Sequence, residues 1–235
     1  MIAAAVFDLD GTLVDTAPDL VATLNTVFAR EGLPPVAYEA ARNMVGGGAR
    51  HMIERGLAAE RRTLPAAEID RLCRDFIDHY AAHIAERSRP FPGLEAALDE
   101  LTAHGLTLIV CTNKLEWLSV RLLDALGLSS RFAAICGADT FGLKKPDPEL
   151  LRRTLGRAGG RAERAVMVGD SANDVDMARA AGIPVVAVDF GYTETPAREL
   201  NANLVISAFR DLPKAVFGLL GNQVRAGTTN RHFTL

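Results

Sequence analysis

Residues 6–12 read Val-Phe-Asp-Leu-Asp-Gly-Thr and end an apolar run that begins at residue 2. An apolar run of this length predicts one buried strand. Residues two apart on a strand point to the same side, so Asp8 and Asp10 are expected to face one site at the strand's carboxyl end. Two carboxylates so close repel each other unless a cation neutralises them or one of them holds a proton. The stretch therefore predicts a site for a divalent cation, with Mg²⁺ the usual occupant of oxygen ligands. The alternative is an ordinary strand that ends in an Asp-Gly turn.

The whole chain has the composition of a soluble globular protein. Its 235 residues are 49% hydrophobic and 23% charged, with a formal net charge of −3, and this length indicates one or two domains. The small negative charge gives no electrostatic attraction for nucleic acid or anionic membranes. The apolar start stops at Asp8, which is too short for an export signal or a membrane span, and three widely spaced cysteines indicate neither zinc nor disulfides. We therefore expect a cytoplasmic protein with no nucleic-acid or membrane partner.

Residues 16–89 are predicted to be all helical, and we call them the helical insert. A helix start is indicated at residues 15–19 by a capping oxygen, a proline in the first turn and an acid that complements the helix dipole. Apolar residues then recur at helical spacing as far as a break at residues 32–35. Further helices are expected over residues 36–44, over residues 49–57 and from residue 65 onward.

Residues 90–220 alternate between short apolar runs and amphipathic helices. With residues 1–15, this alternation predicts an α/β fold, a doubly wound parallel sheet covered by helices on both faces. Residues 221–235 are polar, lack periodicity and are expected to be a flexible C-terminal tail. The predicted strands are residues 2–7, 106–111, 132–136, 165–168, 184–188 and 204–206, and the predicted helices are residues 93–104, 115–126, 148–158, 174–181, 195–200 and 212–220.

Polar side chains follow four of these strands, at the edge where ligands of open parallel sheets bind. Each group alone has a simpler explanation, because such residues can cap a helix, form a solvated lysine pair or complement a helix dipole. Together they supply acids for a metal, a hydroxyl and a lysine, which are the parts of a phosphoryl-transfer site. The groups are Asp8 with Asp10, Thr112 with Asn113, Lys144 with Lys145, and Asp170 with Asp174.

These groups, in this order, resemble the motifs of the haloacid dehalogenase-like superfamily of phosphotransferases. Asp8-x-Asp10-Gly-Thr resembles its first motif, Thr112 its second, Lys145 before Pro-x-Pro its third, and Gly-Asp170-Ser-x-x-Asp174 its fourth. The resemblance implies a Rossmann-like catalytic core of residues 1–15 and 90–220, with residues 16–89 as a small helical cap domain. Residues 15–20 and the Gly-Gly-Gly at 46–48 are most similar to the phosphoglycolate phosphatase-like branch.

The resemblance implies an Mg²⁺-dependent phosphatase that works through an aspartyl-phosphate. Asp8 would be the nucleophile, and Asp10 would protonate the leaving alcohol and then activate water. Thr112 and Lys145 would hold the phosphoryl oxygens, with Lys144 as the alternative to Lys145. The metal would be held by Asp8, Asp170 and the backbone carbonyl of Asp10, and supported by Asp174 directly or through a water.

The expected substrate is a small anionic phosphomonoester such as 2-phosphoglycolate, and the expected enzyme is a monomer or homodimer. Three further residues are candidates for substrate binding, namely Asn113, Gly47 and Arg50. Glycine lets backbone amides approach a small ligand closely, and an arginine can meet a carboxylate, although a solvated helix face explains Arg50 equally well. The rivals in the same superfamily are a hexose-phosphate mutase and a sugar-phosphate phosphatase.

Other protein classes agree less well with the sequence. A dehalogenase has no use for Asp10, and a phosphonate hydrolase with a cap lysine is disfavoured because residues 16–89 contain no lysine. A receiver-like signalling module is also a doubly wound sheet with a phospho-accepting Asp. Its acidic pair is adjacent, however, whereas Asp8 and Asp10 flank a leucine, and a long helical insert has no place in it.

Overall fold

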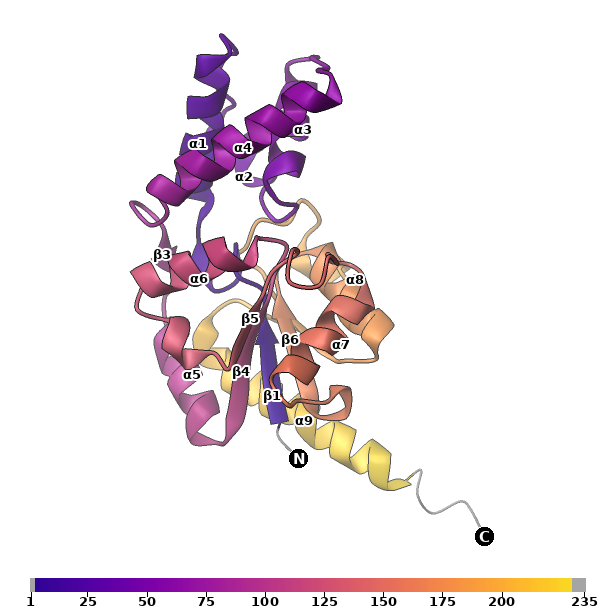
Figure 1. The fold of residues 1–235 in the computed structure, drawn as a ribbon. Helices are drawn as coiled ribbons and strands as arrows, with labels where there is room; N and C mark the ends of the chain where they lie inside the picture. The colour runs from indigo at the N-terminus through magenta and orange to yellow at the C-terminus, as the bar shows by residue number, and fades with distance from the viewer. Residues whose placement is uncertain (1–2, 230–235) are drawn as a thin grey trace.

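The computed structural model describes residues 3–229, in which a sheet with helices around it lies beneath a group of helices α1–α4 (Figure 1). The sheet has six parallel strands in the order β5-β4-β1-β6-β7-β8. The chain moves outward from β1 through β4 to β5 and then returns to β6 on the other side of β1, which places a crevice at the carboxyl ends of these strands. The predicted α/β fold class is confirmed. The strands are β1 (Ala3–Phe7), β4 (Leu106–Cys111), β5 (Ala134–Cys136), β6 (Ala165–Gly169), β7 (Val185–Val188) and β8 (Leu204–Ile206).

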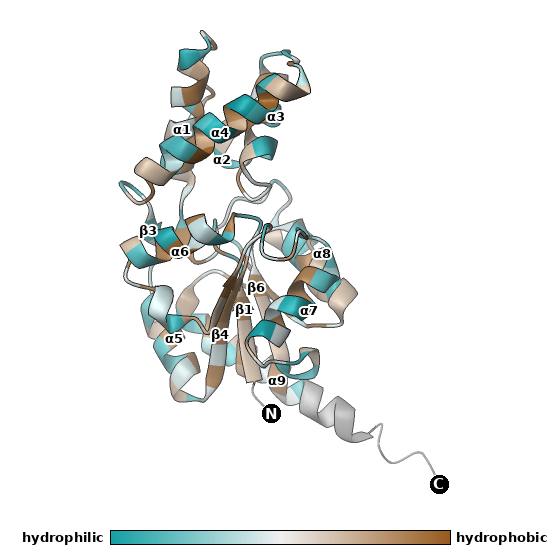
Figure 2. Ribbon diagram, in the orientation of Figure 1, coloured by the Kyte–Doolittle hydropathy of each residue, from teal (hydrophilic) through white to brown (hydrophobic). Residues whose placement is uncertain are grey.

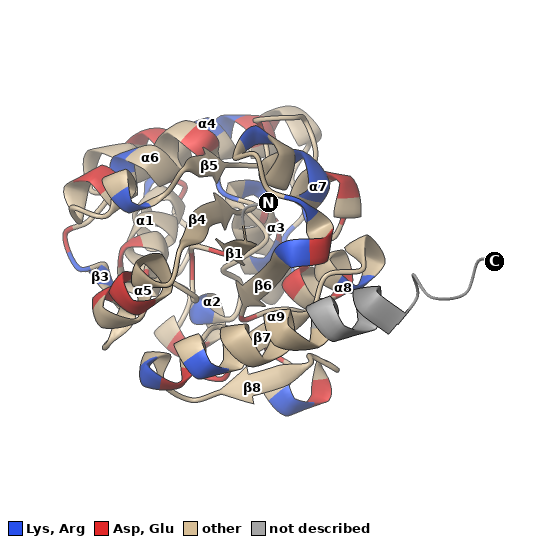
Figure 3. Ribbon diagram, turned by 90° about the horizontal axis from the view of Figure 1, so that it is seen from below, with Lys and Arg blue, Asp and Glu red and all other residues tan. Residues whose placement is uncertain are grey.

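Helices cover both faces of this sheet because successive residues of its strands point in opposite directions. Ala5 and Phe7 of β1 pack toward α5 (Leu94–Ala103), α6 (Glu116–Ala125) and α9 (Leu212–Thr229). Ala4 and Val6 pack toward α7 (Pro148–Arg157) and α8 (Ala172–Ala181). All four of these side chains are fully buried, and the strands form the hydrophobic centre of the molecule in Figure 2. Viewed from below, acidic and basic residues are interspersed over the outer helices (Figure 3).

The helical insert contains α1 (Ala17–Arg30), α2 (Tyr38–Arg42), α3 (Ala49–Ala59) and α4 (Ala66–Ala82). Helices α1 and α3 both pack on α4, and their apolar faces include the buried Phe28, Ile53 and Phe76. Gly56 lets α3 approach α1 closely, since a Cβ at this position would lie 2.8 Å from Cζ of Phe28. The mid-helix glycine therefore serves packing between helices, at a cost of roughly 1 kcal/mol in helix propensity.

Two short strands, which the sequence does not predict, connect the insert to the sheet. β2 (Val14–Asp15) pairs antiparallel with β3 (Arg89–Pro90). Beside this pair, the buried Asp19 carboxylate accepts hydrogen bonds from the backbone amides of Arg87 and Ser88 and from Ser88 Oγ, the last at 2.6 Å. The acid expected to complement the dipole of α1 thus also ties the two connecting segments together.

Most predicted boundaries agree with the structure to within two residues, but two predicted elements differ more. The segment 195–200 forms only one 3₁₀ turn, η3 (Ala197–Glu199), because an apolar spacing over six residues is too short to sustain an α-helix. Helix α9 continues past residue 220 to Thr229, since Gly221 weakens a helix without ending it once the preceding turns are formed. The rest of the expected flexible tail, residues 230–235, lies outside the described residues. Among residues 3–229, no helix combines the length and apolar character needed to cross a bilayer.

Candidate functional site

Three buried carboxylates meet at the carboxyl ends of β1 and β6. Asp8 directly follows β1, Asp170 directly follows β6, and Asp174 lies in the first turn of α8. Their oxygen atoms lie within 4.8 Å of one another, and all three residues are buried. More than 150 positions of sequence separate Asp8 from Asp170 and Asp174, and the parallel sheet brings them to one edge.

Neighbouring donors fix the orientation of Asp170. Its Oδ1 accepts a hydrogen bond from Thr12 Oγ1 at 2.9 Å, and its Oδ2 accepts one from the backbone amide of Tyr192 at 2.8 Å. Gly11 provides the space, since a Cβ there would lie 2.5 Å from Asp170 Oδ2, and its φ of +84° also favours glycine. The Gly-Thr after the paired acids therefore shapes the site of an acid far along the chain.

Asp174 serves both its helix and the acid cluster. Its Oδ2 accepts hydrogen bonds from Ser171 Oγ at 2.7 Å and the Ser171 amide at 3.1 Å, which completes a capping box at the start of α8. Its Oδ1 lies 2.6 Å from Lys145 Nζ. One carboxylate oxygen of Asp174 therefore stabilises the start of α8, and the other lies in the acid cluster beside Lys145.

Lys145 is the cation of this cluster. Its buried Nζ lies 2.7 Å from Asp8 Oδ1 as well as 2.6 Å from Asp174 Oδ1. Its backbone amide donates a hydrogen bond to Asn113 Oδ1 at 2.8 Å, which anchors the loop between β5 and α7. Lys144, in contrast, is exposed. The geometry thus favours Lys145 over Lys144 as the lysine beside the acids.

The acid cluster is short of positive charge. Burial, together with the Asp174 and Asp8 carboxylates, raises the pKa of Asp170 to about 8. Burial raises the pKa of Asp8 to about 6, although Lys145 opposes this shift. Burial alone would lower the pKa of Lys145, but Asp174 and Asp8 outweigh it and raise that pKa. Three carboxylates against one ammonium are therefore a donor set that suits a hard divalent cation.

The Asp10 side chain has different partners. Its carboxylate is not part of the three-acid group and instead accepts hydrogen bonds from Lys114 Nζ at 2.9 and 3.0 Å. Thr16 Oγ1 also donates to Asp10 Oδ1, at 2.8 Å, and makes no side-chain capping hydrogen bond at the start of α1. The Asp10 carboxylate is therefore outside the group of acids that could hold a metal, and metal binding by its backbone carbonyl stays a prediction. The ion pair with Lys114 was not predicted; its only sequence signal is a lysine directly after Thr112 and Asn113, at the end of β4.

Thr112 and Asn113 extend from the end of β4 toward the helical insert. Thr112 is buried, and its Oγ1 accepts the backbone amide of Lys114 at 3.3 Å. Asn113 uses Oδ1 for the Lys145 amide and donates from Nδ2 to the carbonyl of Gly46 at 3.2 Å. Asn113 thus joins the lysine loop of the core to the glycine loop of the insert.

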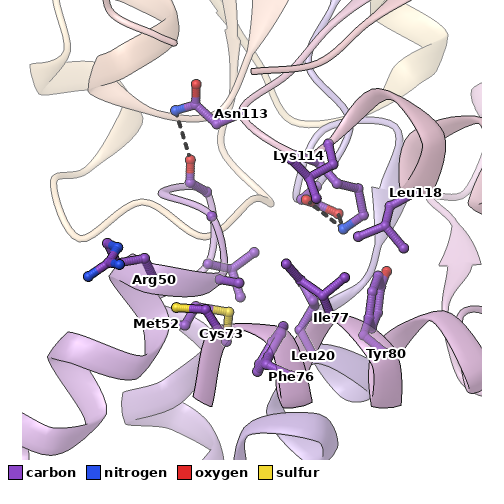
Figure 4. A pocket seen from close by; sticks show the side chains of 16 residues that line it. Leu20, Arg50, Met52, Cys73, Phe76, Ile77, Tyr80, Asn113, Lys114 and Leu118 are labelled. Carbon is purple, nitrogen blue, oxygen red and sulfur yellow. Dashed lines mark hydrogen bonds and ion pairs between the residues drawn. The ribbon is translucent and has the colours of Figure 1, made fainter. Parts of the chain in front are cut away.

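A pocket of about 230 Å³ lies between the sheet edge and the helical insert (Figure 4). Lys114, Asn113 and Asp10 line its core side, and apolar side chains of α1, α3 and α4 line the other. Arg50 lies at the opposite side of the pocket from Lys114. It is half exposed and ion-paired with Glu54 and Asp70, so the structure does not bring this predicted residue to the acids.

A second opening, of about 440 Å³, lies on the other side of the glycine loop and leads to Lys145. Its lining includes Gly47, His51, Lys144 and Ser171. A Cβ at Gly47 would lie 2.4 Å from Cγ of the exposed His51 side chain, which would have to move. Gly47 therefore lines the second opening, whereas its neighbours Gly46 and Gly48 line the first pocket.

The insert is held against the core on the side of Tyr192. Arg42 of α2 donates to the carbonyls of Phe190 and Gly191 at 3.2 and 2.9 Å. Its guanidinium lies over the Tyr192 ring, 5.0 Å from the centroid. The same Tyr192 donates its backbone amide to Asp170, so one residue contacts both the insert and the acid cluster.

Comparison with known proteins gives consistent matches. The family described as haloacid dehalogenase-like hydrolase matches residues 5–188. A phosphoglycolate phosphatase of Caulobacter vibrioides is 51% identical over 218 residues, which is 93% of this chain and 92% of that protein. A phosphoglycolate phosphatase of Mesorhizobium japonicum is 53% identical over 204 residues, 87% of this chain and 90% of that one. Among solved structures, a predicted phosphoglycolate phosphatase from Haemophilus somnus superposes with a TM-score of 0.85 at 28% identity, covering 91% of this chain and 97% of its own.

Proposed function

Because the chain belongs to the haloacid dehalogenase-like hydrolases, we propose that it hydrolyses 2-phosphoglycolate to glycolate and inorganic phosphate. The observation that supports the reaction class is the meeting of Asp8 with Lys145, Asp170 and Asp174 in one buried cluster. The identity of the substrate rests on the relatives. They are named phosphoglycolate phosphatase and are about 50% identical to this chain over most of both sequences. The cavity of about 230 Å³ suits a substrate of this small size.

We assign the metal site to Asp8, Asp170, Asp174 and the backbone carbonyl of Asp10, with Mg²⁺ as the ion. The excess of buried negative charge in this donor set supports the assignment. When bound, the ion would neutralise charge on the acids and on the phosphoryl oxygens. Asp174 shares its oxygens between Ser171 and Lys145, so we assign it to the metal either directly or through a water.

The proposed reaction is carried by the side chains around Asp8. An Asp8 oxygen attacks phosphorus, the ester oxygen leaves, and an aspartyl-phosphate forms. Asp10 protonates the departing alcohol and then takes a proton from the water that hydrolyses the acyl phosphate, which regenerates Asp8 and releases phosphate. Lys145 and Thr112 hold the phosphoryl oxygens; the contact of Lys145 with Asp8 and the burial of Thr112 at the end of β4 support these roles.

The helical insert, residues 16–89, is proposed to act as a cap that closes over the core of residues 1–15 and 90–220. Closure would exclude water from the aspartyl-phosphate until the alcohol has left. Asn113 and Gly47 lie where the two parts meet and are proposed to contact the substrate. We further propose a cytoplasmic enzyme that acts as a monomer or homodimer.

A substrate panel tests this proposal. The purified chain is assayed for phosphate release from 2-phosphoglycolate, sugar phosphates and other small phosphoesters with Mg²⁺, and 2-phosphoglycolate is expected to give the highest kcat/KM. The same samples are analysed for isomerised hexose phosphate, which a mutase would produce. Asp8→Asn should release no phosphate while retaining the wild-type circular dichroism spectrum. A preference for a sugar phosphate, or turnover by Asp8→Asn, would contradict the proposal.

A further inference from the structure

Lys114 is a buried cation of the pocket that the reaction scheme leaves without a function. Its side chain is 6% exposed, and it lines the pocket beside Asp10. An ammonium has three N–H donors. The structure gives Lys114 Nζ one ion-pair partner among the described residues, the two oxygens of Asp10, so donor capacity remains for a ligand in the pocket.

Tyr80, from α4 of the helical insert, places a second donor at the same point. Lys114 Nζ lies 4.4 Å from the centroid of the Tyr80 ring, and Figure 4 shows the two residues on the same side of the pocket. Tyr80 is 1% exposed, yet its hydroxyl has no hydrogen-bond partner among residues 3–229. Burial, with Asp10 and Asp19 nearby, raises the pKa of Tyr80 well above its ordinary value, so the phenol stays a donor. A buried donor without a partner is unfavourable, and an acceptor on a bound ligand would satisfy it.

The apolar lining of the pocket around Lys114 and Tyr80 favours binding of an anion by these two residues. The lining around it is apolar, with Leu20, Phe76, Ile77 and Leu118. Arg50 already has two acidic partners and lies at the other side. An ammonium and a phenol in apolar surroundings attract a carboxylate strongly, because little water is present to screen the interaction.

We propose that Lys114 and Tyr80 bind the second anionic group of the substrate, and that they select phosphorylated 2-hydroxy acids over phosphoesters without a carboxylate. The inference rests on the proposed function, in which Asp10 serves the ester oxygen. In a phosphorylated 2-hydroxy acid, the carboxylate is attached to the carbon that carries this oxygen. Lys114 Nζ lies 2.9 Å from Asp10, so a substrate placed with its ester oxygen at Asp10 has its carboxylate next to Lys114.

The test compares matched esters that differ only in the carboxylate. The pairs are 2-phosphoglycolate against ethyl phosphate, and 2-phospholactate against isopropyl phosphate. For Lys114→Met we expect kcat/KM for the carboxylate-bearing esters to fall about 10- to 100-fold, as for loss of a hydrogen bond to a charged group. The change for the alkyl phosphates, which lack the carboxylate, should be much smaller. Tyr80→Phe, which removes only the unpaired hydroxyl, should lower the same preference about 3- to 10-fold. Lys214→Met, at an exposed position of α9, is the charge-matched control and should retain the wild-type preference.

Product inhibition provides a second measurement. Glycolate should inhibit Lys114→Met and Tyr80→Phe more weakly than wild type, whereas inhibition by inorganic phosphate should be unchanged. If Lys114→Met does not fold, Tyr80→Phe decides the question alone. Equal losses for both members of each ester pair, or unaltered glycolate inhibition, would overturn the inference. A wild-type enzyme that prefers another carboxylate-bearing ester to 2-phosphoglycolate would overturn the proposed substrate and leave the assignment of Lys114 and Tyr80 supported.

Discussion

Replacing Asp170 by Asn should stabilise the metal-free protein, even though Asp170 belongs to the proposed metal site. Burial, then the nearby Asp174 and Asp8 carboxylates, raise the pKa of Asp170 from its ordinary 3.8 to about 8. The folded protein therefore holds this proton more tightly than the unfolded chain does. With a raised carboxyl pKa, the contribution to stability is full below pH 3.8 and is lost as the pH rises toward about 8.

The structure gives the size of this effect. Between pH 3.8 and pH 7 the unfolded chain releases this proton while the folded protein keeps it. Over these roughly 3 pH units the free energy of unfolding falls by about 4 kcal/mol. Asn retains an acceptor for Thr12 but cannot accept the Tyr192 amide at its second position, a loss of about 1 kcal/mol. The net gain is about 3 kcal/mol, which corresponds to a rise in Tm of about 6–12 °C for a chain of this size.

Thermal unfolding in EDTA measures the change in Tm of the metal-free protein. Unfolding at increasing Mg²⁺ concentrations then measures how much the metal stabilises each protein. At about 100 times its Kd, Mg²⁺ should stabilise the wild type by about 3 kcal/mol and stabilise Asp170→Asn far less. The advantage of Asp170→Asn in EDTA should shrink as the pH is lowered from 8 to 5. Asp176→Asn, at an exposed position of the same helix α8, is the control and should behave like wild type. A lower Tm for metal-free Asp170→Asn at pH 8, or equal stabilisation of both proteins by Mg²⁺, would refute this electrostatic reasoning.

Three other changes probe separate parts of the molecule. Asp19→Ala leaves the Ser88 hydroxyl and two backbone amides without their buried acceptor, so chemical denaturation should show a loss of about 2–4 kcal/mol; a loss below 0.5 kcal/mol would contradict the connecting role. Gly56→Ala pushes a Cβ toward the Phe28 ring and should lower stability by about 1–3 kcal/mol, whereas Gly218→Ala, with open space around it, should not. Phosphate release should stop in excess EDTA and return with Mg²⁺; activity that survives the chelator would remove the metal from the scheme.

The sheet was predictable because its strands are apolar on both faces. β4 and β8 have the predicted boundaries, since a run of apolar residues is visible in the sequence without knowledge of its neighbours. The paired segments β2 and β3 were not predicted, because a two-residue strand has no periodicity to detect. The end of α9 was missed for a related reason, since a polar sequence can continue a helix that has already formed.

The acids of the site were predictable from their positions after strands, but their partners were not. Lys114 follows two polar residues at the end of β4, and nothing in its local sequence distinguishes it from a solvated lysine. Only the folded structure shows that Lys114 pairs with Asp10 and lies over the Tyr80 ring. Arg50 illustrates the opposite case, a residue that was predicted to bind substrate but is paired with other residues. Its guanidinium forms ion pairs with Glu54 on its own helix and with Asp70 on α4. Pairing between distant segments is a tertiary property that residue type does not encode.

The Asp19 hydrogen bonds have a consequence for how the helical insert can move. The Asp19 carboxylate accepts hydrogen bonds from Ser88, and β2 pairs with β3. The two segments that connect the insert to the core are therefore bonded to each other before they reach the sheet. The two connections of the insert to the sheet therefore form one joint, at β2, β3 and Asp19. If the insert moves, it should rotate as a rigid body about this joint. The contact of Asn113 with Gly46 and the contact of Arg42 with Phe190 and Gly191 should then break together.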